Sequence, residues 1–229
     1  MSSLMKRTTR GALILALLAG VISPLQAQAL SPFLQREATQ WGYVYAGPNT
    51  TVKQSPREKV AYIEAKSKFV VNYKNFPEWA KKDFQAAVDI WSANFSSSVP
   101  VTIDATWTRI GSFGVLGSAR PGNYFSGFDG APDQSLWYPS ALANALAGKD
   151  LDPENPEMVI QVNSMATWNT RNDGAPRSNE YDLESVFLHE MAHGLGFLST
   201  DSYDQFFGYG TLEQPTPYDA YAQLADGRR

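Results

Sequence analysis

The segment from Asp182 to Phe197 reads DLESVFLHEMAHGLGF, and the interpretation of the rest of the chain starts from it. Its apolar residues recur at intervals of three and four, which predicts a helix over Tyr181–Leu195 with one face packed into a core. Asp182 stands near the start of that helix, where an N-cap is expected. Gly194 and Gly196 come where the helix must stop, because glycine allows the left-handed turn that leads the chain away.

The chemically informative residues of this helix are His189, Glu190 and His193. Residues four apart on a helix lie about 40° apart around its axis, so the two imidazoles can reach one ion. Glu190 lies on the same side and is placed to take a proton from a metal-bound water without being a ligand. Zinc suits this pattern, because it favours imidazole and activates water for attack on a peptide carbonyl. We therefore predict a zinc peptidase site with metal ligands His189 and His193 and the general base Glu190.

Composition restricts the alternatives to this site. The 229 residues are 43% hydrophobic and 18% charged, which is typical of a globular protein. The absence of cysteine excludes disulfides, cysteine-based zinc fingers and thiol nucleophiles. The chain has only two histidines, and both lie in the motif, so any further metal ligand must be a residue of another type.

The N-terminus has the pattern of an export signal. Three basic residues precede an uncharged apolar run over Gly11–Ile22, and the small residues Ala27 and Ala29 suit cleavage before Leu30. Twelve apolar residues are too few to cross a bilayer core of about 30 Å as a helix. We expect a signal peptide over residues 1–29 and a protein that is secreted or periplasmic.

Charge and hydropathy indicate the kind of partner. Without the three basic residues of the leader, 16 Lys and Arg stand against 23 Asp and Glu, a net charge of −7. An acidic surface argues against nucleic acid as a partner. No second hydrophobic stretch follows the leader, so we expect no membrane span in the mature chain. The expected partner is a protein or peptide substrate.

The remaining patterns predict an α+β fold. Alternation and β-branched content predict strands at Trp41–Val52, Lys68–Tyr73, Val99–Ile110 and Met158–Val162, and apolar spacing predicts helices from Pro77 to about Phe95 and over Ser140–Ala147. The glycine-rich stretch Gly111–Gly130 is expected to be a winding loop or an irregular edge strand. We expect an N-terminal segment over residues 30–64 and a catalytic domain over residues 65–229.

The motif His189–Phe197 (HEMAHGLGF) resembles the zinc signature of metzincin metalloproteases, and within them the leishmanolysin type. The region is also similar to secreted bacterial metalloproteases associated with a protease-associated domain. Three further stretches carry this resemblance: Phe84–Trp91, Val99–Asp104 and Ala141–Gly148. The resemblance implies a zincin-like N-terminal subdomain, which consists of a twisted mixed sheet with a backing helix and an active-site helix. It also suggests that Met158–Val162 is the edge strand along which an extended substrate lies, although a core strand is the simpler interpretation.

The third zinc ligand departs from this resemblance. The family pattern places His or Asp where this chain has Ser199, and the methionine expected in a later turn is missing, because no methionine follows Met191. One explanation is a distant histidine beyond Arg229, which would make the domain over 65–229 a truncated one. The other is an internal carboxylate, for which the candidates are Asp201, Asp204, Glu213 and Asp219. Glu213 has a spacing that resembles thermolysin-type enzymes, but the Gln-Pro-Thr-Pro sequence that follows cannot form helix interior.

Two other functions remain open at this stage. A site with two histidines and no third protein ligand holds metal weakly, so the chain could be a secreted binding or structural module with a vestigial zinc site. The motif by itself is also compatible with an enzyme that acts on a substrate other than protein.

Overall fold

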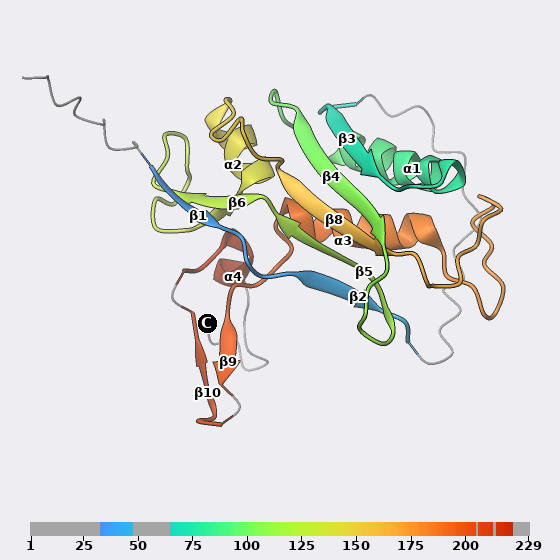
Figure 1. Ribbon diagram of the computed structural model, residues 1–229. Coiled ribbons are helices and arrows are strands. Elements are labelled where there is room, and N and C mark those ends of the chain that lie inside the picture. Colours follow the sequence, from blue (N-terminus) through green and yellow to red (C-terminus); the bar gives the residue numbers. More distant parts are fainter. Residues whose placement is uncertain (1–32, 48–64, 205, 213, 222–229) are drawn as a thin grey trace, which may run out of the picture. The chain divides into compact units, whose positions relative to one another are not determined.

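A mixed five-stranded sheet organises the described part of the chain. The computed structural model describes residues 33–47, 65–204, 206–212 and 214–221, all within one unit of the chain. In spatial order the strands are β2 (Gly42–Tyr45), β5 (Val115–Pro121), β8 (Met158–Asn163), β4 (Val101–Thr108) and β3 (Phe69–Lys74) (Figure 1). β3, β4 and β8 are parallel to one another, whereas β5 is antiparallel to β8 and β2 is antiparallel to β5.

The central strand of this sheet is β8. It pairs with β4 on one side and β5 on the other, so that Ile160 is aligned with both Ala105 and Ala119. Met158, Ile160 and Val162 have no exposed surface and belong to the main core. The predicted buried strand over Met158–Val162 is thus confirmed, but its use as a substrate edge is wrong, because both of its edges are already paired.

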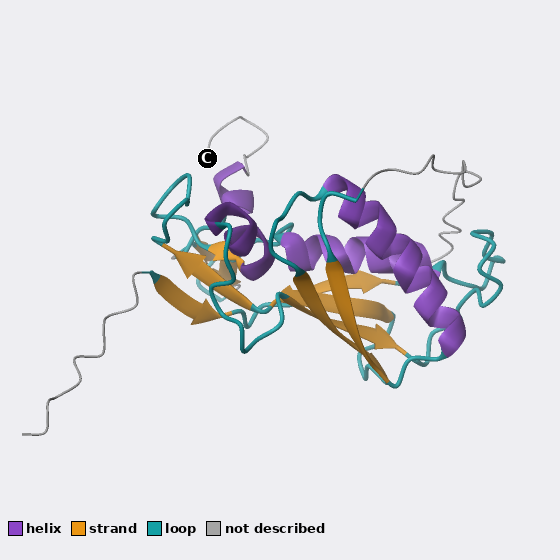
Figure 2. Cartoon of the chain, turned by 90° about the horizontal axis from the view of Figure 1, so that it is seen from above, coloured by secondary structure: helices purple, strands orange, loops and turns teal. Residues whose placement is uncertain are grey.

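Two long helices cover the same face of the sheet, as Figure 2 shows. They are α1 (Glu78–Asn94), which begins directly after Pro77, and α3 (Leu183–Leu195). The two helices meet through Phe84 and Phe187, whose ring centroids lie 4.4 Å apart and whose side chains are fully buried. This contact joins α3 to α1, and it uses the apolar faces that the spacing of residues predicted for both helices.

The ends of α3 follow from single residues. Asp182 accepts a hydrogen bond from the backbone N–H of Ser185 at 2.9 Å and caps the first turn. Gly196 ends the helix in the left-handed conformation, with φ of 116°. Gly194 lies inside the helix and has a packing role, because a Cβ built there would lie 2.7 Å from Sδ of Met158 on β8.

The chain also forms a second, smaller sheet of three strands. It consists of β1 (Leu34–Glu37), β6 (Asn123–Ser126) and β7 (Tyr138–Pro139), and it is followed by α2 (Ser140–Ala147). These elements have their own core, built from Phe125, Phe128, Ala131, Tyr138 and Ala143. The C-terminal elements are the hairpin of β9 (Ser202–Asp204) and β10 (Tyr209–Thr211) and the short helix α4 (Pro217–Tyr221).

The stretch Gly111–Gly130 is the main correction to the predicted fold. It was expected to be a loop or an irregular edge strand, yet it contains β5 and β6, and β5 is an interior strand of the five-stranded sheet. Its glycines permit close packing. A Cβ at Gly122 would lie 1.9 Å from the carbonyl oxygen of Pro156, and one at Gly117 would lie 2.9 Å from a carboxyl oxygen of Glu190.

The described residues agree with the expectation of no membrane span. None of the helices they form has both the length and the apolar character that crossing a bilayer requires. The signal peptide expected over residues 1–29 and most of the N-terminal segment 30–64 lie outside the described residues. The α+β class with a mixed sheet and two long helices is confirmed.

Replacing Phe84 with alanine tests the contact between the two helices. Because this ring is fully buried between Tyr73, Phe76 and Phe187, we expect Phe84→Ala to lower the free energy of unfolding by about 3–5 kcal/mol. Urea denaturation followed by far-UV circular dichroism measures the change. Phe113→Ala is the matched control, because this phenylalanine is fully exposed; equal effects in the two variants would contradict the packing described.

Candidate active site

Two imidazole nitrogens face each other on α3. The Nε2 atoms of His189 and His193 lie 2.9 Å apart, and the two rings are nearly perpendicular. Two nitrogens bound to one tetrahedral zinc ion at the usual bond length are about 3.3 Å apart, so a movement of a few tenths of an ångström suffices. The structure therefore brings together the two predicted ligands, through their Nε2 atoms.

The orientation of His193 is set by the end of the helix. Its Nδ1 lies 2.8 Å from the carbonyl oxygen of Phe197, to which an Nδ1–H donates. That carbonyl is in place because the chain turns at Gly196 and the Phe197 N–H bonds back to Ala192. A proton on Nδ1 leaves the Nε2 lone pair directed at His189, which is the arrangement found at histidine metal ligands.

The neutral form of His189 is also favoured. Partial burial of the ring, and next the charge of His193, lower the pKa of His189 below its ordinary value. The residue as a whole is still exposed to solvent. An unprotonated imidazole that solvent can reach is the state that binds a metal ion.

The third residue of the motif, Glu190, is completely buried. Its carboxyl group lies beneath Gly117 of β5 and next to the backbone N–H of Val44 of β2. The Val44 N–H is near enough to favour the charged form, but no hydrogen bond of good geometry reaches either oxygen among the described residues. Burial raises the pKa of Glu190 to about 8, while the nearby Val44 backbone opposes the rise. A buried carboxyl group without a partner is costly, and in native proteins it marks a functional group or a ligand that is still to be bound.

None of the expected third ligands that the structure describes joins the two histidines. Among residues 33–47, 65–204, 206–212 and 214–221, no group of three His, Asp or Glu side chains is close enough to hold one metal ion. Asp219 instead accepts hydrogen bonds from Ser199, Thr200 and Thr216. Two other candidates are used locally, Asp201 by Ser199 and Asp204 by Phe206 and Phe207. Glu213 lies outside the described residues.

An apolar cavity of about 460 Å³ begins where α3 ends. Its lining comes from the residues that directly follow His193 and from α2 and α4: Leu142, Leu195, Gly196, Phe197, Pro217, Tyr218 and Tyr221. Phe197 thus contributes to this cavity and also provides the carbonyl that orients His193.

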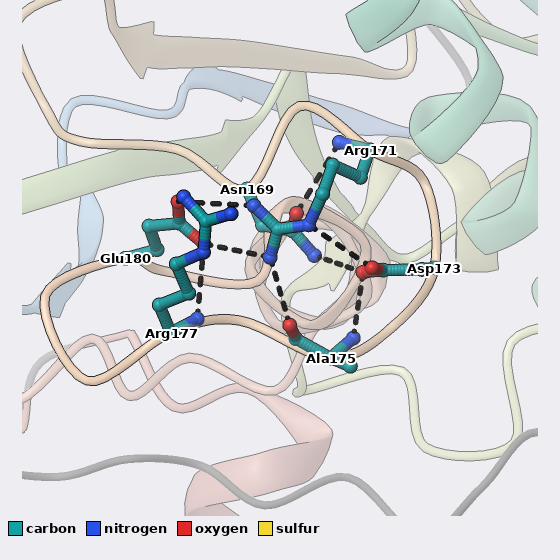
Figure 3. A network of polar contacts seen from close by, with 6 residues as sticks. All are labelled: Asn169, Arg171, Asp173, Ala175, Arg177 and Glu180. Carbon is teal, nitrogen blue, oxygen red and sulfur yellow. Dashed lines mark hydrogen bonds and ion pairs between the residues drawn. The ribbon is translucent and has the colours of Figure 1, made fainter.

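The loop before α3 is held by a network of charges, drawn in Figure 3. The guanidinium of Arg171 donates two parallel hydrogen bonds to the carboxylate of Glu180 and one to Asp173. Hydrogen bonds from Arg171 and from the Arg177 backbone lower the pKa of Glu180 to about 2. Asn172 connects the same loop to Asp83 of α1. The network fixes the path by which the chain enters the active-site helix.

Three parts of the site lay outside the sequence prediction: the glycines Gly42 and Gly117 and the carbonyl of Phe197. The two glycines approach the side chains of His193 and Glu190 so closely that any Cβ would overlap them. A glycine inside a short run of apolar and small residues, as in Val115–Ala119, can indicate such an approach, although the glycine content of Gly111–Gly130 as a whole favours a loop.

The pKa of Glu190 predicts how stability varies with pH in protein freed of metal. Since the folded state raises this pKa from 4.5 to about 8, the folded chain keeps a proton that the unfolded chain has released, and stability falls as pH rises through this window. We expect the free energy of unfolding to fall by about 3 kcal/mol more in the wild type than in Glu190→Gln between pH 5 and pH 8. Parallel curves for the two proteins would contradict the burial of the carboxyl group.

The comparison with known proteins identifies a family. The chain belongs to the SPBPB7E8-like family, whose sequence pattern matches residues 49–214 and so includes α1, α3 and the whole motif. No curated protein and no solved structure matches the chain significantly.

Proposed function

We propose that this protein is an exported zinc-dependent endopeptidase with metal ligands His189 and His193 and with Glu190 as general base. The observation that supports the proposal most strongly is a single turn of α3. It presents two Nε2 atoms 2.9 Å apart and, beside them, a buried carboxyl group without a partner. Neighbouring imidazoles and a carboxyl group of raised pKa are the groups that metal-assisted hydrolysis needs.

The donor set fits zinc as far as the described residues go. His189 and His193 would hold the ion, and the bond from His193 Nδ1 to Phe197 keeps one ligand oriented before binding. Bound there, zinc would supply a Lewis acid, which polarises a peptide carbonyl and lowers the pKa of water so that hydroxide can form at neutral pH. In the observed arrangement Asp201, Asp204 and Asp219 do not supply the third protein ligand, because no group of three possible ligands forms among the described residues.

Glu190 is suited to move protons during hydrolysis. Its raised pKa lies near neutral pH, which favours a group that accepts a proton from water and then gives it to the leaving amine. Gly117 leaves the space into which the carboxyl group is directed. The apolar cavity after α3 is of a size and character to receive an apolar side chain of the substrate.

The finer fold and family assignments belong to the same proposal. The motif from His189 to Phe197 supports a metzincin-like enzyme of the leishmanolysin type. The order of elements, with α1 and α3 against a sheet that carries one antiparallel strand beside the motif helix, is compatible with the N-terminal subdomain of a zincin. The leader pattern over residues 1–29 supports export.

A non-catalytic module with a vestigial zinc site is the second candidate. It is favoured by one observation, that the described residues bring only two metal-binding side chains together. Such a module would keep the fold of α1 and α3 but would release zinc on dialysis and cleave no peptide.

Exchange of Glu190 for glutamine tests the enzyme directly. We expect zinc to remain bound after dialysis while the rate of cleavage of a casein substrate falls by at least about 100-fold, since the base is lost and the shape is kept. Zinc is measured by atomic absorption. Glu154→Gln is the control, because that glutamate is exposed on a loop.

Unchanged cleavage by Glu190→Gln would overturn the role of this residue. A wild-type protein that is stably folded, holds no zinc after dialysis and is inactive would favour the vestigial module.

A further inference from the structure

Strand β2 lies directly over the motif. Gly42 faces the ring of His193, and a Cβ built at this glycine would lie 2.2 Å from Cδ2 and 2.6 Å from Nε2 of that ring. Two residues further on, the Val44 backbone lies at the carboxyl group of Glu190. Tyr43 and Tyr45 point the other way and are 44% and 61% exposed. The backbone of β2 therefore covers the two groups that a substrate would have to reach.

β2 also occupies the edge of the sheet next to the motif. β5 has β8 on one side, so the side that bonds to β2 is its remaining edge. On this edge Gly42 is aligned with Ala119, and Val44 with Gly117. An extended peptide that adds a strand to β5 would have to form backbone hydrogen bonds with β5 in place of those that β2 makes. β2 lies where such a peptide would lie.

β2 is the shortest strand of the five-stranded sheet. It has four residues, and its register is irregular between Val44 and Tyr45. Beyond the ladder it is held by the N–H of Ala46 on the Gly114 carbonyl at 2.6 Å and by the packing of Val44 and Ala46 against the main core. The match to the SPBPB7E8-like family begins at residue 49, so β2 lies outside the matched residues.

We propose that β2 is an inhibitory strand: it takes the place of an extended peptide on β5, and a peptide gains access to Glu190 and His193 when β2 leaves. The inference rests on the proposed function where it treats that peptide as the substrate. The glycine at position 42 is what allows the strand to lie against the imidazole, because any side chain there overlaps the ring.

The test uses the full chain, freed of metal, with valine at position 42. Gly42→Val cannot lie against His193, so β2 should detach. His189 is exposed in the wild type, so we expect it to react with diethyl pyrocarbonate in both proteins. We expect the second histidine, His193, to be modified at least about tenfold faster in Gly42→Val, followed at 240 nm, because its ring is no longer covered. The signal is specific, because the chain contains no histidine outside the motif. Gly111→Val is the matched control, because a Cβ at Gly111 meets nothing within 4 Å.

A second experiment adds the sequence of β2 back as a separate peptide, so that the test does not rest on the reactivity of a single variant. A synthetic peptide of residues 39–47 (TQWGYVYAG) should bind to Gly42→Val and restore slow modification, whereas a scrambled peptide should not. Gly42→Ala, which adds one carbon atom, is used in the same way if the valine variant folds poorly. Hydrogen exchange should show faster exchange in β2 and β5 but unchanged protection in β4 and β8.

The outcomes separate this inference from the proposed function. Loss of protection throughout β4 and β8 in both variants, or folded variants with unchanged histidine reactivity, would overturn the inhibitory strand. Detached β2 with peptide binding but no cleavage by the zinc-loaded variant would support the strand and contradict the peptidase. If the wild type cleaves a peptide and neither Gly42→Val nor Gly42→Ala cleaves it faster, the result would support the peptidase and contradict the inhibitory strand.

Discussion

The candidate site depends on the burial of one carboxyl group beside two imidazoles. Glu190 has no exposed surface and no hydrogen bond of good geometry among the described residues, and it lies within the same turn of α3 as the two facing Nε2 atoms. A group of this kind destabilises a protein unless it serves a purpose. The surrounding structure compensates through the main core, where Phe84 and Phe187 join α1 to α3. The site is thus held by a helix whose other face is fixed in apolar packing.

Close packing of backbone on side chains is the second constraint. Gly117 leaves room for the Glu190 carboxyl group, Gly42 for the His193 ring and Gly194 for Met158. These three glycines allow β5, β2 and β8 to approach α3 more closely than residues with a Cβ would permit. The same closeness that would let β5 bind a peptide beside the motif also allows β2 to cover it. Catalysis and inhibition would then use a single edge of the sheet.

The parts of this structure that sequence predicts well are those determined by local pattern. The helix over 183–195 follows from its apolar spacing, its Asp182 cap and its Gly196 end, and β8 follows from its run of apolar residues. The pairing of two histidines four apart needs only helix geometry. β5 is not predicted because the glycines in and around it resemble those of a loop, while the roles of Gly117 and Gly122 depend on Glu190 and Pro156, which are distant in sequence. The position of β2 cannot be predicted either, since strand pairing depends on tertiary structure.

Local pattern does not identify the third ligand. Asp219 is an example: its carboxylate accepts hydrogen bonds from Ser199, Thr200 and Thr216, and these contacts form only when the C-terminal segment folds.

The most direct measurement is zinc K-edge X-ray absorption of the dialysed wild-type protein. With His189 and His193 as ligands, the spectrum should show nitrogen neighbours at about 2.0–2.1 Å together with the outer-shell scattering of two imidazole rings. Absence of bound zinc, or a shell of oxygen neighbours without imidazole scattering, would contradict a zinc site on α3.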